Sequence, residues 1–154
     1  MTKEQARRYK VPVLKIKMVR DNRGGEPIVL NSHIAAKVFQ YNIGDIPYEE
    51  VWALMVNVKS EITSAVKIGQ GGAHGLGLLA KDILLPVILS GAAGFVLGHN
   101  HPSGDATPSR EDIELTRALS KAAETLCVPL LDHIVIAQDY DKFRYKSLFE
   151  LGLM

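Results

Sequence analysis

A short apolar run followed by two histidines constrains the fold of this chain more than any other feature. Residues 94–98, Gly-Phe-Val-Leu-Gly, carry no charge and are typical of a buried strand. His99 and His101 follow, and side chains two positions apart on a strand point to the same face. A Pro-Ser-Gly sequence at 102–104 then breaks the strand, and a helix is expected to begin near 107–109. The sequence therefore predicts a strand-turn-helix unit with two imidazoles at the strand's end.

The predicted helix adds a carboxylate at the same point. Asp112 lies three residues after Ser109, in the first turn of that helix. Two imidazoles and one carboxylate leave the fourth position of a tetrahedral Zn²⁺ free for water, as catalytic zinc sites require. The metal lowers the pKa of that water towards neutrality and so generates a nucleophile. His99, His101 and Asp112 are therefore the predicted metal ligands, and Mn²⁺, Fe²⁺ or Co²⁺ could occupy the same donor set.

A simpler interpretation exists for part of this pattern. Ser109-Arg-Glu-Asp112 is close to a capping box, and Thr107-Pro108 could equally be an N-cap followed by proline at the first helical position. Taken alone, Ser109 and Asp112 indicate a helix start, and an isolated His-x-His pattern is weak. The combination is stronger than its parts. Two histidines on the same face of a strand end, a Gly/Pro turn and an acidic residue on the next helix all converge on one point.

The spacing His-x-His, seven residues, Ser, two residues, Asp resembles the JAMM (MPN+) motif. The residues at 99–112, together with Leu-Leu-Asp-His-Ile-Val-Ile at 130–136, are similar to the RadC-like branch of that family, and the resemblance runs from about Leu30 to the C-terminus. It implies a zinc-dependent hydrolase domain related to deubiquitinating isopeptidases, with a cytidine-deaminase-like three-layer fold. Longer family members carry an N-terminal helix-hairpin-helix-like region, which this chain is too short to hold.

The family pattern also contains a glutamate before the first core strand of the domain. Glu49 and Glu50 both fit, within Pro-Tyr-Glu-Glu-Val-Trp at 47–52. RadC-like sequences have a glutamate, one further residue and then a hydrophobic strand, which places Glu49 on the family position. The resemblance implies that Glu49 takes a proton from zinc-bound water and passes it to the leaving amine. A solvated pair of carboxylates at a strand entrance is the alternative.

Four further residues near the motif have expected roles. The resemblance implies that the Ser109 hydroxyl helps to hold the carbonyl oxygen as negative charge develops, and it could do so while capping the helix. Asp132 and His133 belong to the family-like segment, so both could support a metal ligand from behind. A metal-bound histidine usually donates its other ring proton to a carboxylate or carbonyl, which Asp132 or Asp105 could supply. With equal weight, Asp132 and His133 could simply satisfy the backbone or each other at the start of a strand.

Strands that alternate with helices predict a layered α/β domain with a mixed sheet. We expect a single domain over residues 1–154, with a strand and loop extension at 1–29 and the metallohydrolase core at 30–154. The predicted helices are Ser32–Tyr41, Leu76–Ser90 and Pro108–Leu126, the last with a regular apolar stripe. The predicted strands are Val11–Val19, Val51–Val58, Glu61–Ile68, Gly94–His99, His133–Ala137 and Phe143–Leu148, with a polar loop at 21–26 and a hairpin around Lys59-Ser60.

The glycine-rich segment 69–77 lacks the Gly-Lys-Ser/Thr sequence that ends a P-loop. Its glycines at 72, 75 and 77 have the reverse of the Gly-x-Gly-x-x-Gly spacing of dinucleotide-binding loops. We interpret it as a mobile loop that could line a substrate groove. The helix that follows starts with Ala80-Lys81-Asp82, where RadC-like proteins often have Pro-Arg-Glu, so the substrate side departs from the family. His33 and His74 are expected at the surface, and Cys127 as a small buried side chain at a helix end.

Composition restricts the class of protein. A chain of 154 residues with 47% hydrophobic and 23% charged residues is long enough to bury a core. Its single cysteine excludes an intrachain disulfide and suits a reducing compartment. No signal peptide is evident, and the longest apolar stretch, Ile83–Leu89, is too short for a bilayer. We therefore expect a cytoplasmic protein without membrane contact.

Three function classes follow from the sequence. The first is a zinc metallopeptidase or isopeptidase with a peptide or protein substrate. The second is a binding or regulatory module that keeps the fold without proteolysis. The third is a DNA-associated role, because RadC-like proteins are associated with DNA repair, but a net charge of +1 gives no basic footprint and a deaminase signature is missing. The oligomeric state is left open.

Overall fold

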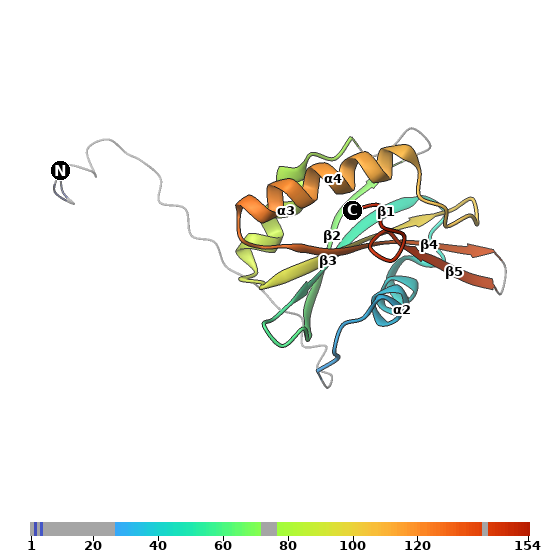
Figure 1. Ribbon diagram of the computed structural model, residues 1–154, viewed down its shortest axis with the longest axis horizontal. Coiled ribbons are helices and arrows are strands. Elements are labelled where there is room, and N and C mark those ends of the chain that lie inside the picture. The colour runs from blue at the N-terminus through green and yellow to red at the C-terminus, as the bar shows by residue number, and fades with distance from the viewer. Residues whose placement is uncertain (1, 3, 5–26, 72–76, 140–141) are drawn as a thin grey trace.

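The computed structural model describes residues 2, 4, 27–71, 77–139 and 142–154. Within that part, a five-stranded mixed sheet has one helix on one face and two helices on the other, which confirms the predicted three-layer α/β architecture (Figure 1). The elements are α2 (Ser32–Ile43), β1 (Glu49–Val56), β2 (Ile62–Gly71), α3 (Ala80–Leu89), β3 (Gly94–His101), α4 (Arg110–Thr125), β4 (Leu130–Asp139) and β5 (Lys142–Ser147).

The strands lie in the order β2-β1-β3-β4-β5. Strand β1 pairs antiparallel with both β2 and β3, and β4 pairs antiparallel with β5. Strands β3 and β4 are parallel, because α4 carries the chain back across the sheet between them. The predicted hairpin around Lys59-Ser60 is confirmed: Ser60 lies in the left-handed region (φ 60°), and the Asn57 side chain accepts hydrogen bonds from the backbone N–H groups of Lys59 and Glu61.

The sheet separates two hydrophobic cores, and β3 contributes to both. Phe95 and Leu97 face α3 and α4, whereas Val96 faces α2. This follows from the alternation of side chains along a strand that is buried on both faces. Residues of the first core also include Ile83, Val87, Leu119 and Ala123, and those of the second include Ala35, Ala36, Phe39 and Ile43.

Three predicted boundaries are wrong by three residues or more, and one of them is the start of β4, which begins at Leu130 and not at His133. Helix α3 begins at Ala80 and not at Leu76, because the Asp82 carboxylate accepts a hydrogen bond from the backbone of the extended residue Leu79 and fixes the helix start there. Residues 69–71 are not part of a loop: they extend β2 and pair with the start of β1. The rest of that segment, residues 72–76 with His74, lies outside the described residues, as do the strand predicted at 11–19 and the loop at 21–26.

The prediction of a buried Cys127 is also wrong, because this residue is exposed. It follows the C-cap of α4 with φ 56°, and its backbone N–H donates to the carbonyl of Glu124 while that of Val128 donates to Ala123. These two bonds form a Schellman motif, which requires a left-handed residue at this position. The turn directs the Cys127 side chain to solvent and returns the chain to β4.

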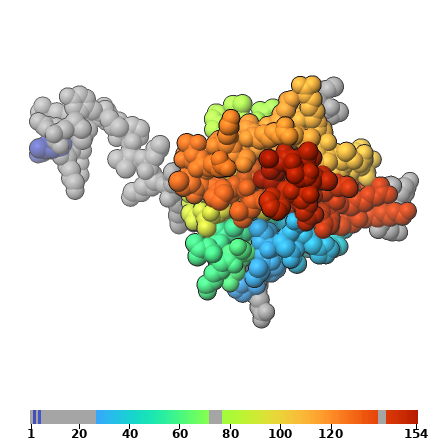
Figure 2. Space-filling model, viewed as in Figure 1, coloured from blue at the N-terminus to red at the C-terminus, as the bar shows by residue number. Residues whose placement is uncertain are grey.

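The C-terminal segment closes one side of the domain. In the space-filling view it fills the surface between α4 and α2 (Figure 2). Leu148 is fully buried and its backbone N–H donates to the His133 carbonyl, and the Arg117 side chain donates to the Leu153 carbonyl. Within the described residues, no helix combines the length and the apolar character needed to cross a membrane.

Gly98 tests how tightly α2 packs on the sheet. A Cβ atom at this position would overlap the ring of Phe39, which is itself fully buried. We expect Gly98→Ala to lower the free energy of unfolding by about 1–3 kcal/mol, measured by urea denaturation. Phe39→Leu in the same chain should recover part of that loss. A change below about 0.5 kcal/mol for Gly98→Ala alone would contradict the packing argument.

Candidate metal centre

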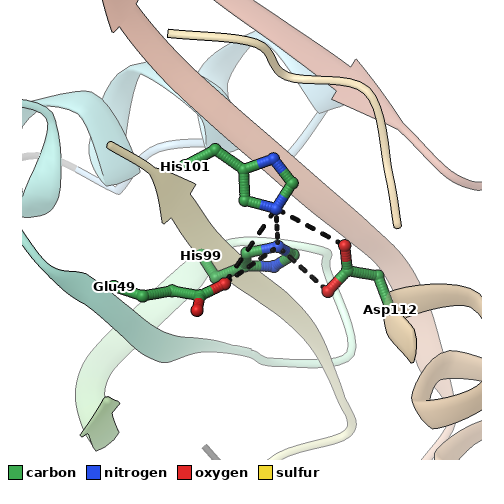
Figure 3. A group of neighbouring side chains, drawn as sticks. All are labelled: Glu49, His99, His101 and Asp112. Carbon is green, nitrogen blue, oxygen red and sulfur yellow. Dashed lines mark hydrogen bonds and ion pairs between the residues drawn. The ribbon is translucent and has the colours of Figure 1, made fainter. Parts of the chain in front are cut away.

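Four side chains from three elements meet at the end of β3 (Figure 3). His99 and His101 come from β3, Glu49 from the first residue of β1, and Asp112 from the first turn of α4. One ligand atom from each of the four lies within 4.8 Å of the others. The structure therefore brings together all the residues that the sequence assigns to the metal site and the proton carrier, in a group that could hold a metal ion.

Three of the four side chains have the spacing of direct ligands. The Nε2 atoms of His99 and His101 lie 3.0 Å apart, and they lie 3.2 and 3.4 Å from the two carboxylate oxygens of Asp112. Zinc–ligand bonds of the usual length at tetrahedral angles place neighbouring ligand atoms about 3.3 Å apart. The Glu49 carboxylate is set back, 3.9 and 4.0 Å from the two Nε2 atoms. The donor set of these three residues therefore fits a Zn²⁺ ion, with Glu49 beside it.

The turn after β3 orients the second imidazole. The backbone carbonyl of Asp105 lies 2.8 Å from His101 Nδ1, and because a carbonyl can only accept, Nδ1 carries the proton and donates it. His101 Nε2 therefore presents a lone pair to the cluster in the neutral ring. Burial alone would lower the pKa of His101, but its hydrogen bonds with Asp112 and this carbonyl raise it above the ordinary value. The surroundings of the cluster thus favour positive charge.

Asp112 is held by the cap of its own helix. The Ser109 hydroxyl and backbone N–H each donate to Asp112 Oδ2 at 2.7 Å, and the Asp112 backbone N–H donates to the Ser109 hydroxyl at 3.1 Å. Burial would raise the pKa of Asp112, but the interactions of its carboxylate with His101 and His99, when these imidazoles are protonated, outweigh burial and keep this pKa well below its usual range. The capping box and the cluster are therefore the same structure, and the helix start and the site are not alternatives.

Asn100 positions the glutamate, a role that the sequence analysis missed. Its side chain is buried on the opposite face of β3, where it accepts from the backbone N–H of Glu50 at 2.8 Å. It also donates to the carbonyls of Ile46 and Tyr48, at 3.2 and 2.9 Å. These bonds fix the chain on both sides of Glu49. A buried polar residue inside an otherwise apolar strand is the signal that could have indicated this role.

The neighbouring glutamate lies away from the cluster. Glu50 is buried and accepts from the Trp52 indole at 2.8 Å and from the Lys67 ammonium at 2.5 Å. Successive side chains of β1 point to opposite faces of the sheet, so Glu49 and Glu50 cannot both reach the site. The structure thus places Glu49 at the cluster and pairs Glu50 with a cation on β2.

The carboxylates of Asp132 and Asp105 do not bind the imidazole rings of the cluster. Asp132 accepts from the hydroxyls of Ser32 and Ser147 and from two backbone N–H groups, and so it joins α2, β4 and the C-terminal segment. The carboxylate of Asp105 binds Thr107, and only its backbone carbonyl reaches the cluster. His33 is exposed, as expected.

His133 lies directly behind the cluster. Its Nε2 is 2.8 Å from Nδ1 of His99, and the ring is almost completely buried. Burial lowers its pKa well below the ordinary value. Of the two interpretations of this residue, the one that placed it behind a metal ligand agrees with the geometry, although an imidazole stands where a carboxylate or carbonyl was expected.

A cleft of about 920 Å³ opens over the cluster. All four cluster residues line it, and its remaining walls are largely apolar. The apolar lining comes from Val51, Leu78, Leu97 and Leu115, with Pro47 and Tyr48 from the segment that precedes β1. The cleft therefore combines polar groups that converge on one point with a hydrophobic surface, as small-molecule and peptide sites do.

A family model described as the RadC-like JAB domain matches residues 29–153. The chain belongs to this family. It is 36% identical over 121 residues to a UPF0758 protein of Carboxydothermus hydrogenoformans, an alignment that covers 78% of this chain and 54% of that protein.

Two further relatives agree with that assignment. A UPF0758 protein of Flavobacterium johnsoniae is 32% identical over 125 residues, or 81% of this chain and 53% of the relative. One of Trichlorobacter lovleyi is 35% identical over 116 residues, or 75% of this chain and 49% of the relative. The chain therefore spans about half the length of the curated relatives it matches, and the RadC-like match includes every residue of the cluster.

Removal of the Asn100 side chain should destabilise this RadC-like domain. We expect Asn100→Ala to cost about 1–3 kcal/mol of unfolding free energy for each buried group left without a partner, as measured by urea denaturation of metal-free protein. Asn42→Ala is the matched control, because the Asn42 amide donates only to a carbonyl within α2. An Asn100→Ala protein as stable as this control would show that the amide does not hold the strand entrance.

Proposed function

We propose that this RadC-like domain is a zinc-dependent hydrolase of peptide or isopeptide bonds. The observation that carries the proposal is the convergence of two imidazole Nε2 atoms and one carboxylate at ligand spacing. A second carboxylate, that of Glu49, lies farther out, 3.9 Å from His99 Nε2. His99, His101 and Asp112 would hold the ion. When bound, Zn²⁺ supplies a Lewis acid that polarises a carbonyl group and makes water nucleophilic near neutral pH.

Glu49 has the position of a proton carrier. Its carboxylate is half-buried and lies too far from the imidazoles to share the inner ligand spacing, which leaves room for a water molecule beside it. In the proposed reaction, that water forms a C–O bond to the scissile carbonyl carbon and gives one proton to Glu49. The C–N bond then breaks, and Glu49 returns the proton to the leaving amine.

Ser109 has two roles in this proposal. Its hydroxyl hydrogen points to Asp112 Oδ2, and this bond holds the ligand carboxylate in place. The hydroxyl also lines the cleft, so rotation of this hydrogen towards a substrate carbonyl would let it stabilise the developing oxyanion. The cleft walls support a peptide or protein substrate, because their apolar side chains suit apolar residues on either side of an amide bond.

Zinc content is the first test of the proposed site. Elemental analysis of the purified wild-type protein should find about one zinc per chain, and His101→Ala should lose it, because that variant removes one of three protein ligands. Lys121→Ala is the control, because this side chain is exposed on α4. If the wild-type protein binds no zinc after reconstitution, the binding or regulatory module becomes the better interpretation.

The role of Glu49 is tested by a pair of neighbouring variants. Glu49→Gln should keep its zinc but lose about 10²–10⁴-fold in kcat on a panel of peptide and isopeptide substrates, because the amide cannot carry the proton. Glu50→Gln should stay within a few-fold of the wild type, because Glu50 faces Trp52 and Lys67. Equal activity of Glu49→Gln and the wild type would remove Glu49 from the mechanism.

A further inference from the structure

We propose that Thr116 and His133 are positioning residues that set the tautomer of His99, so that its Nε2 is free to bind the metal. This inference rests on the metal site of the proposed function. It concerns Thr116, to which the sequence analysis assigned no role, and His133, for which it left two interpretations open.

A continuous chain of hydrogen bonds runs behind the cluster. The Thr116 hydroxyl donates to the backbone carbonyl of Asp112 at 2.6 Å and lies 2.6 Å from His133 Nδ1. His133 Nε2 in turn lies 2.8 Å from His99 Nδ1. Thr116 is fully buried, and the exposed fractions of His133 and His99 are 1% and 2%. Because all three side chains are enclosed, each bond must be made by the protein itself.

The direction of each bond follows from the one group that can only accept. The Asp112 carbonyl has no proton, so the single hydroxyl hydrogen of Thr116 goes to it. The Thr116 oxygen can then only accept, and His133 Nδ1 must donate to it. A neutral imidazole has one ring proton, so His133 Nε2 accepts from His99 Nδ1–H. His99 Nε2 is then left with a lone pair that points into the cluster.

The opposite direction would disable the site. If Thr116 donated to His133, then His133 would donate to His99 and place the His99 proton on Nε2. That proton would occupy the position where the metal binds, and the carbonyl of Asp112 would lose one hydrogen bond. Thr116 therefore selects between two states of the imidazole pair.

The two ligand histidines need different supports, because the groups behind their Nδ1 atoms differ. The acceptor behind His101 is the Asp105 carbonyl, which fixes the tautomer without further help. The acceptor behind His99 is another imidazole, which can donate or accept from either nitrogen. Only a third group can fix its direction, and Thr116 supplies it from the helical turn that follows Asp112. The same hydrogen-bond chain thus links the ligand on α4 to the ligand on β3.

A matched pair of variants tests this role through metal affinity. Thr116→Val keeps the shape of the side chain and removes the hydroxyl, whereas Thr116→Ser keeps the hydroxyl. We expect the zinc Kd, measured by competition with a chelator, to rise about 10–100-fold for Thr116→Val and to change only a few-fold for Thr116→Ser. Equal zinc affinity of Thr116→Val and the wild type would overturn the proposal.

A second measurement uses the wild-type protein and avoids any loss of folding. In the metal-free protein, long-range ¹H–¹⁵N correlation spectra of the histidine rings distinguish a proton on Nδ1 from one on Nε2. We expect His133 and His99 both to carry it on Nδ1. A proton on Nε2 of His133 would overturn the inference.

Neither readout depends on catalysis. Zinc binding without hydrolysis would contradict the proposed reaction, but the zinc affinities of Thr116→Val and Thr116→Ser could still be compared. A His133 proton on Nε2 in a protein that binds zinc and hydrolyses peptides would contradict this inference and leave the proposed function supported. The two proposals can therefore fail separately.

Discussion

Strand β3 supplies the constraint on which the rest of the structure depends. One of its faces carries the two imidazoles of the cluster, and the other packs against α2 over the same few residues. His99 and His101 continue the face of Phe95 and Leu97, which packs beneath α3 and α4. The alternate residues face α2, where Gly98 makes room for the Phe39 ring. A shift of one residue in the register of β3 would therefore exchange the metal ligands with core positions. The burial of both faces is what keeps the two imidazoles directed at one point.

The cluster directs several electron-rich atoms at one point, where a cation would be stabilised. Two Nε2 atoms 3.0 Å apart, each with its proton assigned to Nδ1, direct lone pairs at one another and at the oxygens of Asp112. Such an arrangement is retained only if the surrounding structure enforces it. The surrounding structure does so here, since Asp105, the buried His133 and the cap of α4 each hold one member. The raised pKa of His101 and the low pKa of Asp112 are two expressions of this demand for positive charge.

The sequence was sufficient for the parts of this structure that depend on local pattern. The alternation and apolar character of 94–98, the turn after His101 and the helix stripe after Ser109 are all short-range signals, and they predicted the unit that contains three of the four cluster residues. The supports are different in kind. Thr116 and His133 are 17 residues apart and Asn100 and Glu50 are 50 apart, so their contacts depend on strand order and on the path of α4.

Two of the errors come from judging a residue by its type alone. Cys127 was expected inside because its side chain is small and apolar, but the left-handed backbone that ends α4 turns it outward. Residues 69–71 were expected in a loop because glycine is a poor strand former. Pairing with the start of β1 extends the strand regardless, and this places the last residue of β2 opposite Glu49. A helix-end motif overrides the preference of the residue type at Cys127, and a tertiary strand pairing overrides it at residues 69–71.

Strand geometry alone is sufficient to choose between Glu49 and Glu50 as the glutamate at the cluster. Val51 pairs with His99 across β1 and β3, and paired residues share a face of the sheet. Residues of odd number near the start of β1 therefore face the cluster, and those of even number face α2. This parity assigns Glu49 to the site without any family pattern, and it explains why Glu50 needs a cation and an indole of its own. A buried carboxylate on the opposite face must be neutralised there, and Lys67 neutralises it on β2.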